Sequence, residues 1–66
     1  MRIEINGEPH ESPAGITVEA LLTELGIDPR SGAVERNREI VPKSAYGITV
    51  LRDGDCLEII QFVGGG

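Results

Sequence analysis

The chain is predicted to form a single α+β domain, in which one main helix packs on one face of a mixed β-sheet. Three observations lead to this prediction: strand-like alternation near both ends, one amphipathic helix in the first half, and glycine turns between the segments. The length of 66 residues allows one small domain with a modest core. Two strands, a helix and further strands, in that order, suit a sheet that buries one face beneath a helix.

The first two strands are predicted to form a hairpin. Residues 2–6 alternate polar and apolar side chains, as a half-buried strand does. Asn6 and Gly7 both tolerate positive φ, so they favour a two-residue hairpin turn. Residues 8–11 are then the partner strand, and Pro9 indicates an edge position because it has no backbone N–H to donate.

The main helix is predicted to begin after Thr17 and to end before Gly26. Threonine caps helix N-termini through its side-chain oxygen, and glycine adopts the left-handed conformation that ends many helices. Apolar residues spaced at i, i+3, i+4 and i+7 give the helix one buried stripe: Val18, Leu21, Leu22 and Leu25. We interpret this stripe as core and assign it no function.

The connection to the last strand is predicted to contain short elements. Residues 33–37 read as a strand, and a tight turn then leads to the apolar pair Ile40 and Val41. Pro42 ends that segment, and residues 43–47 fit a single helical turn.

The end of the chain is predicted to form two further strands. Residues 48–51 are a candidate strand or strand entry, and Asp53 and Gly54 give a second hairpin signal. The final strand is expected to begin at residue 56 or 57 and to end at Val63. The folded domain is therefore assigned to residues 1–63.

Alternation assigns the two faces of the final strand. An unpaired glutamate is rarely buried, so Glu58 is placed on the solvent side. Ile60 and Phe62 have the same parity and should also face outward. Exposed apolar residues grouped at one place predict a docking patch, here Ile60, Phe62 and the adjoining Val63. The alternatives are that a loop covers these residues or that both faces of the strand are buried.

The last three residues, Gly64, Gly65 and Gly66, are expected to form a flexible tail, residues 64–66. Residues without Cβ can thread a narrow channel, and three of them reach roughly 10 Å when extended. The carboxylate of Gly66 could then enter a partner's active site, where transfer to AMP would make an anhydride that a sulfur nucleophile can attack. The alternative is a frayed terminus without function.

Composition excludes several classes of protein. The net charge of −5, the scattered basic residues and the presence of only two aromatic residues argue against nucleic-acid binding. No apolar run has the length of a membrane span or a signal peptide, so the chain is predicted to be cytoplasmic and to have no membrane partner. One cysteine and one histidine predict neither an intrachain disulfide nor a metal site.

Two other candidate sites are weaker. Cys56 could carry sulfur as a persulfide, but its neighbours in the sequence are acidic, so we interpret it as a partly buried and inert strand residue. His10 and Glu11 are adjacent on a strand and should therefore face opposite sides, which argues against a catalytic pair.

Several motifs together resemble a known family. VERN at residues 34–37, IVP at 40–42, DGD at 53–55 and the glycine end occur in this order, along with the earlier turn and helix. Across the whole chain they resemble the ThiS family of sulfur carriers in thiamine biosynthesis. The resemblance implies a ubiquitin-like β-grasp fold. It also implies that Gly66 is adenylated and converted to a thiocarboxylate, with Gly65 completing the functional pair and Gly64 extending the tail.

The resemblance further implies a carrier rather than an enzyme. Such a carrier binds no cofactor itself, and its activating partner uses ATP and Mg²⁺. The implied partners are an adenylyltransferase resembling ubiquitin-activating enzymes, a thiazole synthase and a sulfur-donating enzyme, and the sulfur goes to the thiazole ring of thiamine. Three alternatives stay open from the residues: the small subunit of a molybdopterin-synthase-like enzyme, a ubiquitin-like modifier joined to lysines, and a purely non-covalent interaction domain.

Overall fold

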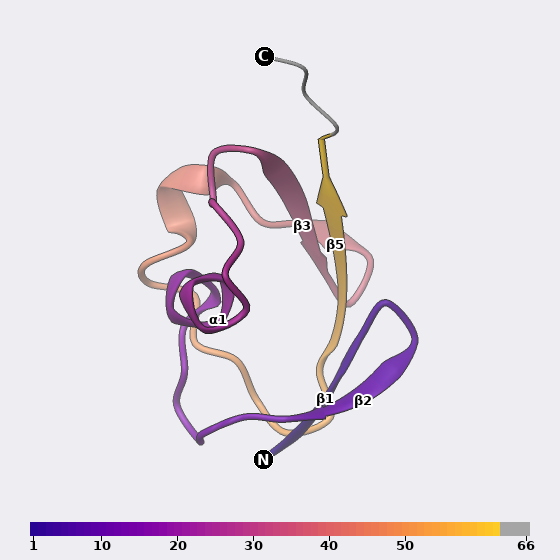
Figure 1. The fold of residues 1–66 in the computed structure, drawn as a ribbon. Helices are drawn as coiled ribbons and strands as arrows, with labels where there is room; N and C mark the ends of the chain where they lie inside the picture. The colour runs from indigo at the N-terminus through magenta and orange to yellow at the C-terminus, as the bar shows by residue number, and fades with distance from the viewer. Residues whose placement is uncertain (63–66) are drawn as a thin grey trace.

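The computed structural model describes residues 1–62, where five strands form one mixed sheet in the order β2-β1-β5-β3-β4 (Figure 1). The strands are β1 (Arg2–Ile5), β2 (Glu8–Glu11), β3 (Gly32–Arg36), β4 (Glu39–Ile40) and β5 (Cys56–Gln61). The helix α1 (Val18–Glu24) lies on one side of the sheet, and a 3-10 helix, η1 (Lys43–Ala45), follows β4. The predicted α+β architecture is therefore confirmed.

The sheet is mixed because β1 and β5 run parallel, whereas the other neighbouring strands are antiparallel. β1 and β2 form the predicted hairpin, in which Asn6 and Gly7 adopt φ of 52° and 83°. The Asn6 side chain then extends the pairing of β1 with β5. Its amide donates to the Ile59 carbonyl over 3.2 Å, and its oxygen accepts from the Ile59 N–H over 2.8 Å. β2 is an edge strand, as Pro9 predicts.

Helix α1 has the predicted caps. The Thr17 hydroxyl accepts from the backbone N–H of Ala20 over 3.1 Å. At the other end, Gly26 has φ of 73°, and its N–H donates to the Thr23 carbonyl, while the N–H of Ile27 donates to Leu22. This pair of bonds is the Schellman motif, which satisfies carbonyls that the end of a helix leaves without intrahelical partners.

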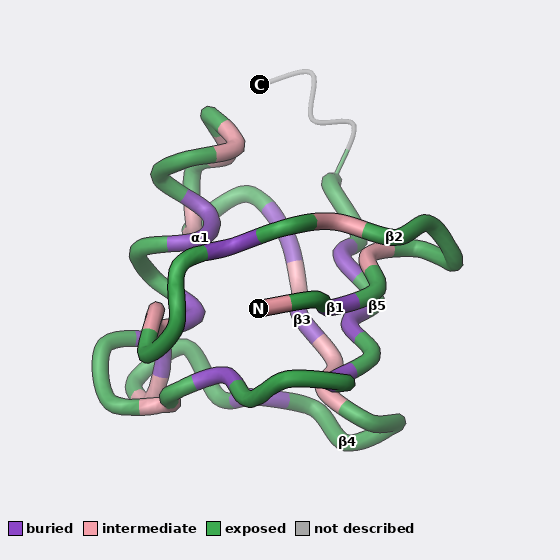
Figure 2. Tube along the Cα trace, turned by 90° about the horizontal axis from the view of Figure 1, so that it is seen from below, coloured by how far each residue is buried: buried purple, intermediate pink, exposed green. Residues whose placement is uncertain are grey.

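The hydrophobic core lies between α1 and the sheet. Purple, buried stretches occur on α1 and on β1, β3 and β5 (Figure 2). Val18, Leu21 and Leu22 are at most 1% exposed, whereas Leu25 is only partly buried. The stripe therefore contributes three fully buried residues to the core. The remaining core residues are Ile3, Val34, Val41, Tyr46, Leu51, Leu57 and Ile59.

The prediction of a strand at residues 48–51 is wrong. The segment makes only an isolated bridge between Val50 and Thr17, and its backbone bonds to the approach to α1 rather than to the sheet. The Thr49 carbonyl accepts from the Val18 N–H over 3.0 Å, and the Leu51 N–H donates to Ile16 over 2.9 Å. The segment pairs outside the sheet because both neighbours of β5 are other strands, β1 and β3.

The prediction of a second hairpin at Asp53 and Gly54 is also wrong, because the strands on both sides of β5 are β1 and β3. Gly54 has φ of 87° and does sit in a turn, but its N–H donates to the Arg2 carbonyl over 2.8 Å. The turn therefore places the start of β5 beside β1, and it does not join two antiparallel strands. β3 also begins and ends one residue earlier than predicted, because Asn37 has φ of 52° and belongs to the turn.

Candidate functional site

The candidate site is the end of β5, the central strand of the sheet. The β3–β5 ladder ends at the pair Gly32 and Gln61, and the N–H of Phe62 adds one more bond to the Ser31 carbonyl over 2.7 Å. A Cβ at position 32 would collide with the Ile60 carbonyl oxygen, so this close pairing requires Gly32. The predicted tail residues and Val63, residues 63–66, lie outside the described residues.

The outer face of β5 is apolar towards its end. Ile60 is 51% exposed and Phe62 57% exposed, whereas Ile59 is buried. The predicted assignment of faces is therefore confirmed, and a docking role for Ile60, Phe62 and Val63 stays a prediction. Nearer the middle of the strand, Glu58 lies directly opposite Glu35 of β3.

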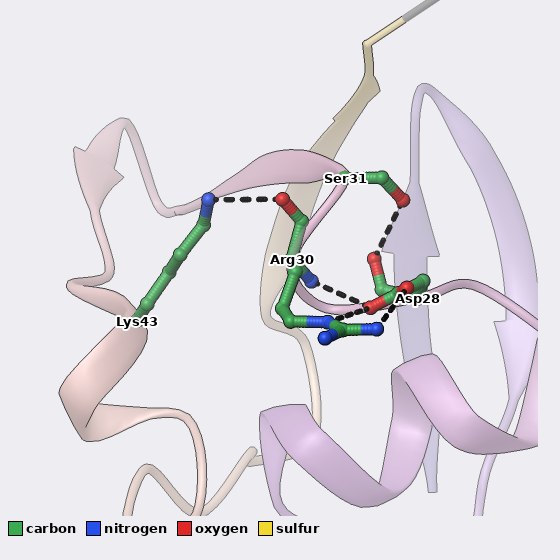
Figure 3. Close-up of polar contacts among 4 residues, drawn as sticks. All are labelled: Asp28, Arg30, Ser31 and Lys43. Carbon is green, nitrogen blue, oxygen red and sulfur yellow. Dashed lines mark hydrogen bonds and ion pairs between the residues drawn. The ribbon is translucent and has the colours of Figure 1, made fainter. Parts of the chain in front are cut away.

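A chain of contacts connects the loop before β3 to Lys43 and Phe62. We call it the tail-root cluster: Asp28, Arg30, Ser31, Lys43 and Phe62. The Asp28 carboxylate accepts from the backbone N–H of Arg30 over 2.9 Å and from its guanidinium over 3.2 and 3.3 Å. The Asp28 carbonyl accepts from the Ser31 hydroxyl over 3.0 Å (Figure 3). The ammonium of Lys43 donates to the Arg30 carbonyl over 3.3 Å and lies 5.7 Å from the centre of the Phe62 ring.

Sequence reasoning did not find this cluster. Asp28 followed by Pro29 is a turn signal that could have indicated the loop, since aspartate bonds backbone groups two residues ahead. The side-chain and backbone hydrogen bonds from Arg30 lower the pKa of Asp28, and these bonds stabilise its ionised carboxylate. No pattern in the sequence placed Lys43 beside Phe62.

The start of β5 is held by a buried carboxylate. Asp55 is 7% exposed and accepts from the Arg36 guanidinium over 2.8 Å, from the Asn37 amide over 3.1 Å and from the Arg52 N–H over 2.8 Å. Burial acts to raise the pKa of Asp55, but these three bonds outweigh it and the pKa is lowered. The motifs VERN and DGD thus meet in space, where they fix the start of β5.

Cys56 lies at this start, at the other end of β5 from Phe62, and it is exposed rather than partly buried as predicted. It is exposed because odd and even positions of β5 face opposite sides, and Cys56 shares the outer side with Glu58. Its thiol donates to the Glu4 carboxylate over 3.3 Å, and this bond raises the pKa of Cys56. A raised pKa leaves less thiolate, so the site does not favour sulfur chemistry on Cys56.

His10 and Glu11 do not form a catalytic pair. Half-buried His10 lies 3.6 Å from the Glu24 carboxylate, while Glu11 is exposed, so these neighbours face opposite sides as predicted. Within residues 1–62, no three His, Cys, Asp or Glu side chains are arranged to hold a metal ion. No helix of that region has both the length and the apolar character needed to span a membrane.

The mixed sheet, the single main helix and the glycines that follow the central strand define a ubiquitin-like β-grasp domain. The crystal structure of the thiamine biosynthesis protein ThiS from Geobacter metallireducens has this fold: it matches with a TM-score of 0.86 and 32% identity, and the match covers both chains completely. The sequence also matches the ThiS family over residues 3–66. The chain therefore belongs to the ThiS family.

The curated relatives include a sulfur carrier and proteins named thiazole synthase. The sulfur carrier protein ThiS of Escherichia coli K12 is 32% identical over the full length of both chains. A protein named thiazole synthase from Paramagnetospirillum magneticum is 59% identical over this whole chain, and another from Magnetococcus marinus is 48% identical. The chain spans only 20% of the length of these two thiazole synthases.

Proposed function

We propose that this chain carries sulfur as a thiocarboxylate on Gly66 and donates it for the thiazole ring of thiamine. The observation that carries the proposal is the family match, which extends to Gly66 itself. The sulfur carrier ThiS of Escherichia coli matches along the whole chain, and the glycines follow β5, the central strand of the sheet, in the sequence. The proposal requires a free carboxyl group on Gly66.

The chemistry needs two steps, and the carrier catalyses neither. In the first, the Gly66 carboxylate attacks the α-phosphate of ATP, so that an acyl-AMP anhydride forms and pyrophosphate leaves. In the second, sulfide (HS⁻) attacks the acyl carbon, so that a C–S bond forms, the C–O bond to AMP breaks, AMP leaves and the sulfur loses its proton to give the thiocarboxylate. We propose that an adenylyltransferase resembling ubiquitin-activating enzymes supplies ATP and Mg²⁺, and that a sulfur-donating enzyme supplies the sulfur. Because activation consumes ATP, we place it in the cytoplasm.

We propose a thiazole synthase as the acceptor of the sulfur. The support is that a segment similar to this chain makes up a fifth of two proteins of that name. A thiocarboxylate tethered to a protein cannot diffuse away as free sulfide would, so the carrier can hand it over inside the active site of its acceptor. The exposed Ile60 and Phe62 would help both partners to recognise the carrier.

Intact mass spectrometry tests this function directly. The chain is incubated with the adenylyltransferase, ATP, Mg²⁺ and a sulfur donor, and we expect a mass gain equal to the replacement of one oxygen by one sulfur. A variant without Gly65 and Gly66 is the control, and it should neither gain this mass nor support pyrophosphate exchange, while its melting temperature stays unchanged. Sulfur gained by the shortened variant, or a native protein whose Gly66 lacks a free carboxyl group, would contradict the proposal.

A further inference from the structure

We propose that Lys43 is a positioning residue, which holds the root of the tail at Phe62 and so fixes the point from which Gly66 reaches its partner. The inference rests on the proposed function, because positioning matters only if Gly66 reacts. Four members of the tail-root cluster, Asp28, Arg30, Ser31 and Lys43, are drawn in Figure 3, and the Lys43 ammonium joins them to the fifth member, Phe62.

One backbone bond secures the last described residue of the chain. The Phe62 N–H donates to the Ser31 carbonyl over 2.7 Å, one step beyond the last pair of the β3–β5 ladder. Terminal ladder bonds open more easily than central ones, since fewer neighbours hold them closed. Phe62 is 57% exposed, so little burial keeps its ring in place.

Lys43 contacts the chain on both sides of that bond. Its ammonium donates to the carbonyl of Arg30, the residue just before Ser31, and it also lies 5.7 Å from the centre of the Phe62 ring. The ammonium therefore joins η1, the loop before β3 and the end of β5 at one point. The loop itself is held by Asp28, whose carbonyl accepts from the Ser31 N–H and hydroxyl over 3.0 Å each.

A fixed Phe62 lowers the entropy lost when the carrier binds a partner. Four residues follow Phe62, and they can extend roughly 13–14 Å. If the bond between Phe62 and Ser31 opens, the partner must order Phe62 on binding, and each further residue that must be ordered weakens binding. Lys43 should therefore strengthen productive binding of the carrier without touching the reacting carboxyl group.

The test compares three variants of the full chain. Lys43→Met removes the charge and the donor, and Lys43→Arg keeps both. Arg52→Met is the matched control, since it removes one positive charge from the loop before β5, at the other end of that strand. Two quantities are measured: hydrogen exchange of the Phe62 amide by NMR, and KM and kcat for the carrier in pyrophosphate exchange with the adenylyltransferase.

We expect Lys43→Met to speed exchange at Phe62 and to raise KM, each about fivefold, as loss of an exposed cation–π contact and its hydrogen bond predicts. Its kcat should not change. Lys43→Arg and Arg52→Met should resemble the wild type in both measurements. Two results distinguish positioning from a general loss of stability: Lys43→Arg restores the wild-type values, and Lys43→Met changes KM without changing kcat.

Two outcomes would overturn the inference. The first is wild-type exchange at Phe62 in Lys43→Met, which can be seen in the carrier alone even if the wild type is never adenylated. If KM is nevertheless raised in that variant, Lys43 contacts the partner directly. The second outcome is an unchanged KM for Lys43→Met in a system where the wild type does turn over. A wild type that is not adenylated would instead count against the proposed function.

Discussion

The two ends of β5 are held in different ways. At its start, the buried carboxylate of Asp55 joins Arg36, Asn37 and the backbone of Arg52. At its end, the exposed Phe62 is held by one backbone bond and by the surface contacts of Lys43. The start therefore contributes mainly to the stability of the fold, and the end presents the residues that we propose partners recognise. Substitutions at the two ends should change different measured quantities.

The largest difference is expected between Leu57→Ala, which should lower stability, and Phe62→Ala, which should mainly lower partner affinity. Leu57 is 2% exposed, and its truncation should lower the free energy of unfolding by ~2–5 kcal/mol. Phe62→Ala should have a smaller effect on folding, but it should weaken partner affinity roughly thirtyfold, from the ~2 kcal/mol of an apolar interface residue. Denaturant unfolding and affinity measurements check both values.

The comparison fails if Phe62→Ala unfolds the domain while affinity per folded molecule stays constant. Phe62→Ala should also weaken binding more than Lys43→Met, because it removes the docking surface as well as the contact with the ammonium.

A pH-dependent loss of stability is expected at the start of β5. The pKa of Asp55 is lowered in the folded protein, so the carboxylate stabilises the fold above its ordinary pKa of about 3.9, and this contribution disappears as pH falls through the lower folded value. Asp55→Asn should cost about 2 kcal/mol at pH 7, because its amide cannot accept all three bonds.

Urea unfolding of both proteins from pH 7 to pH 2 measures this effect. The difference between wild type and Asp55→Asn should be constant down to about pH 4 and should shrink below it. A difference that stays constant to pH 2 would show that the ionised carboxylate is not what stabilises the start of β5.

The smallest effect is expected at Cys56. The hydrogen bond to Glu4 raises its pKa, and its exposed side chain contributes little packing. Cys56→Ser should therefore unfold like the wild type and still acquire sulfur on Gly66. A folded Cys56→Ser protein that fails to acquire sulfur would indicate that Cys56, and not Gly66, is the residue that receives the sulfur.

Much of the fold could be predicted from the sequence because it depends on neighbours in the chain. Asn6 and Gly7 made the first turn predictable, since few residues tolerate positive φ. Thr17 and Gly26 marked the limits of α1, because caps act on backbone groups of the first and last helical turns. The exposed face of β5 followed from alternation, which requires no knowledge of the partner strands.

Only the tertiary structure decided the contacts between distant segments. The segment at residues 48–51 has strand-like residues, but β1 and β3 already occupy both sides of β5, so it bonds to the approach to α1. The meeting of Lys43 with Phe62 likewise depends on where η1 and β5 end relative to one another. Local pattern determines which elements form and which faces they bury, whereas pairing between distant elements determines which side chains meet.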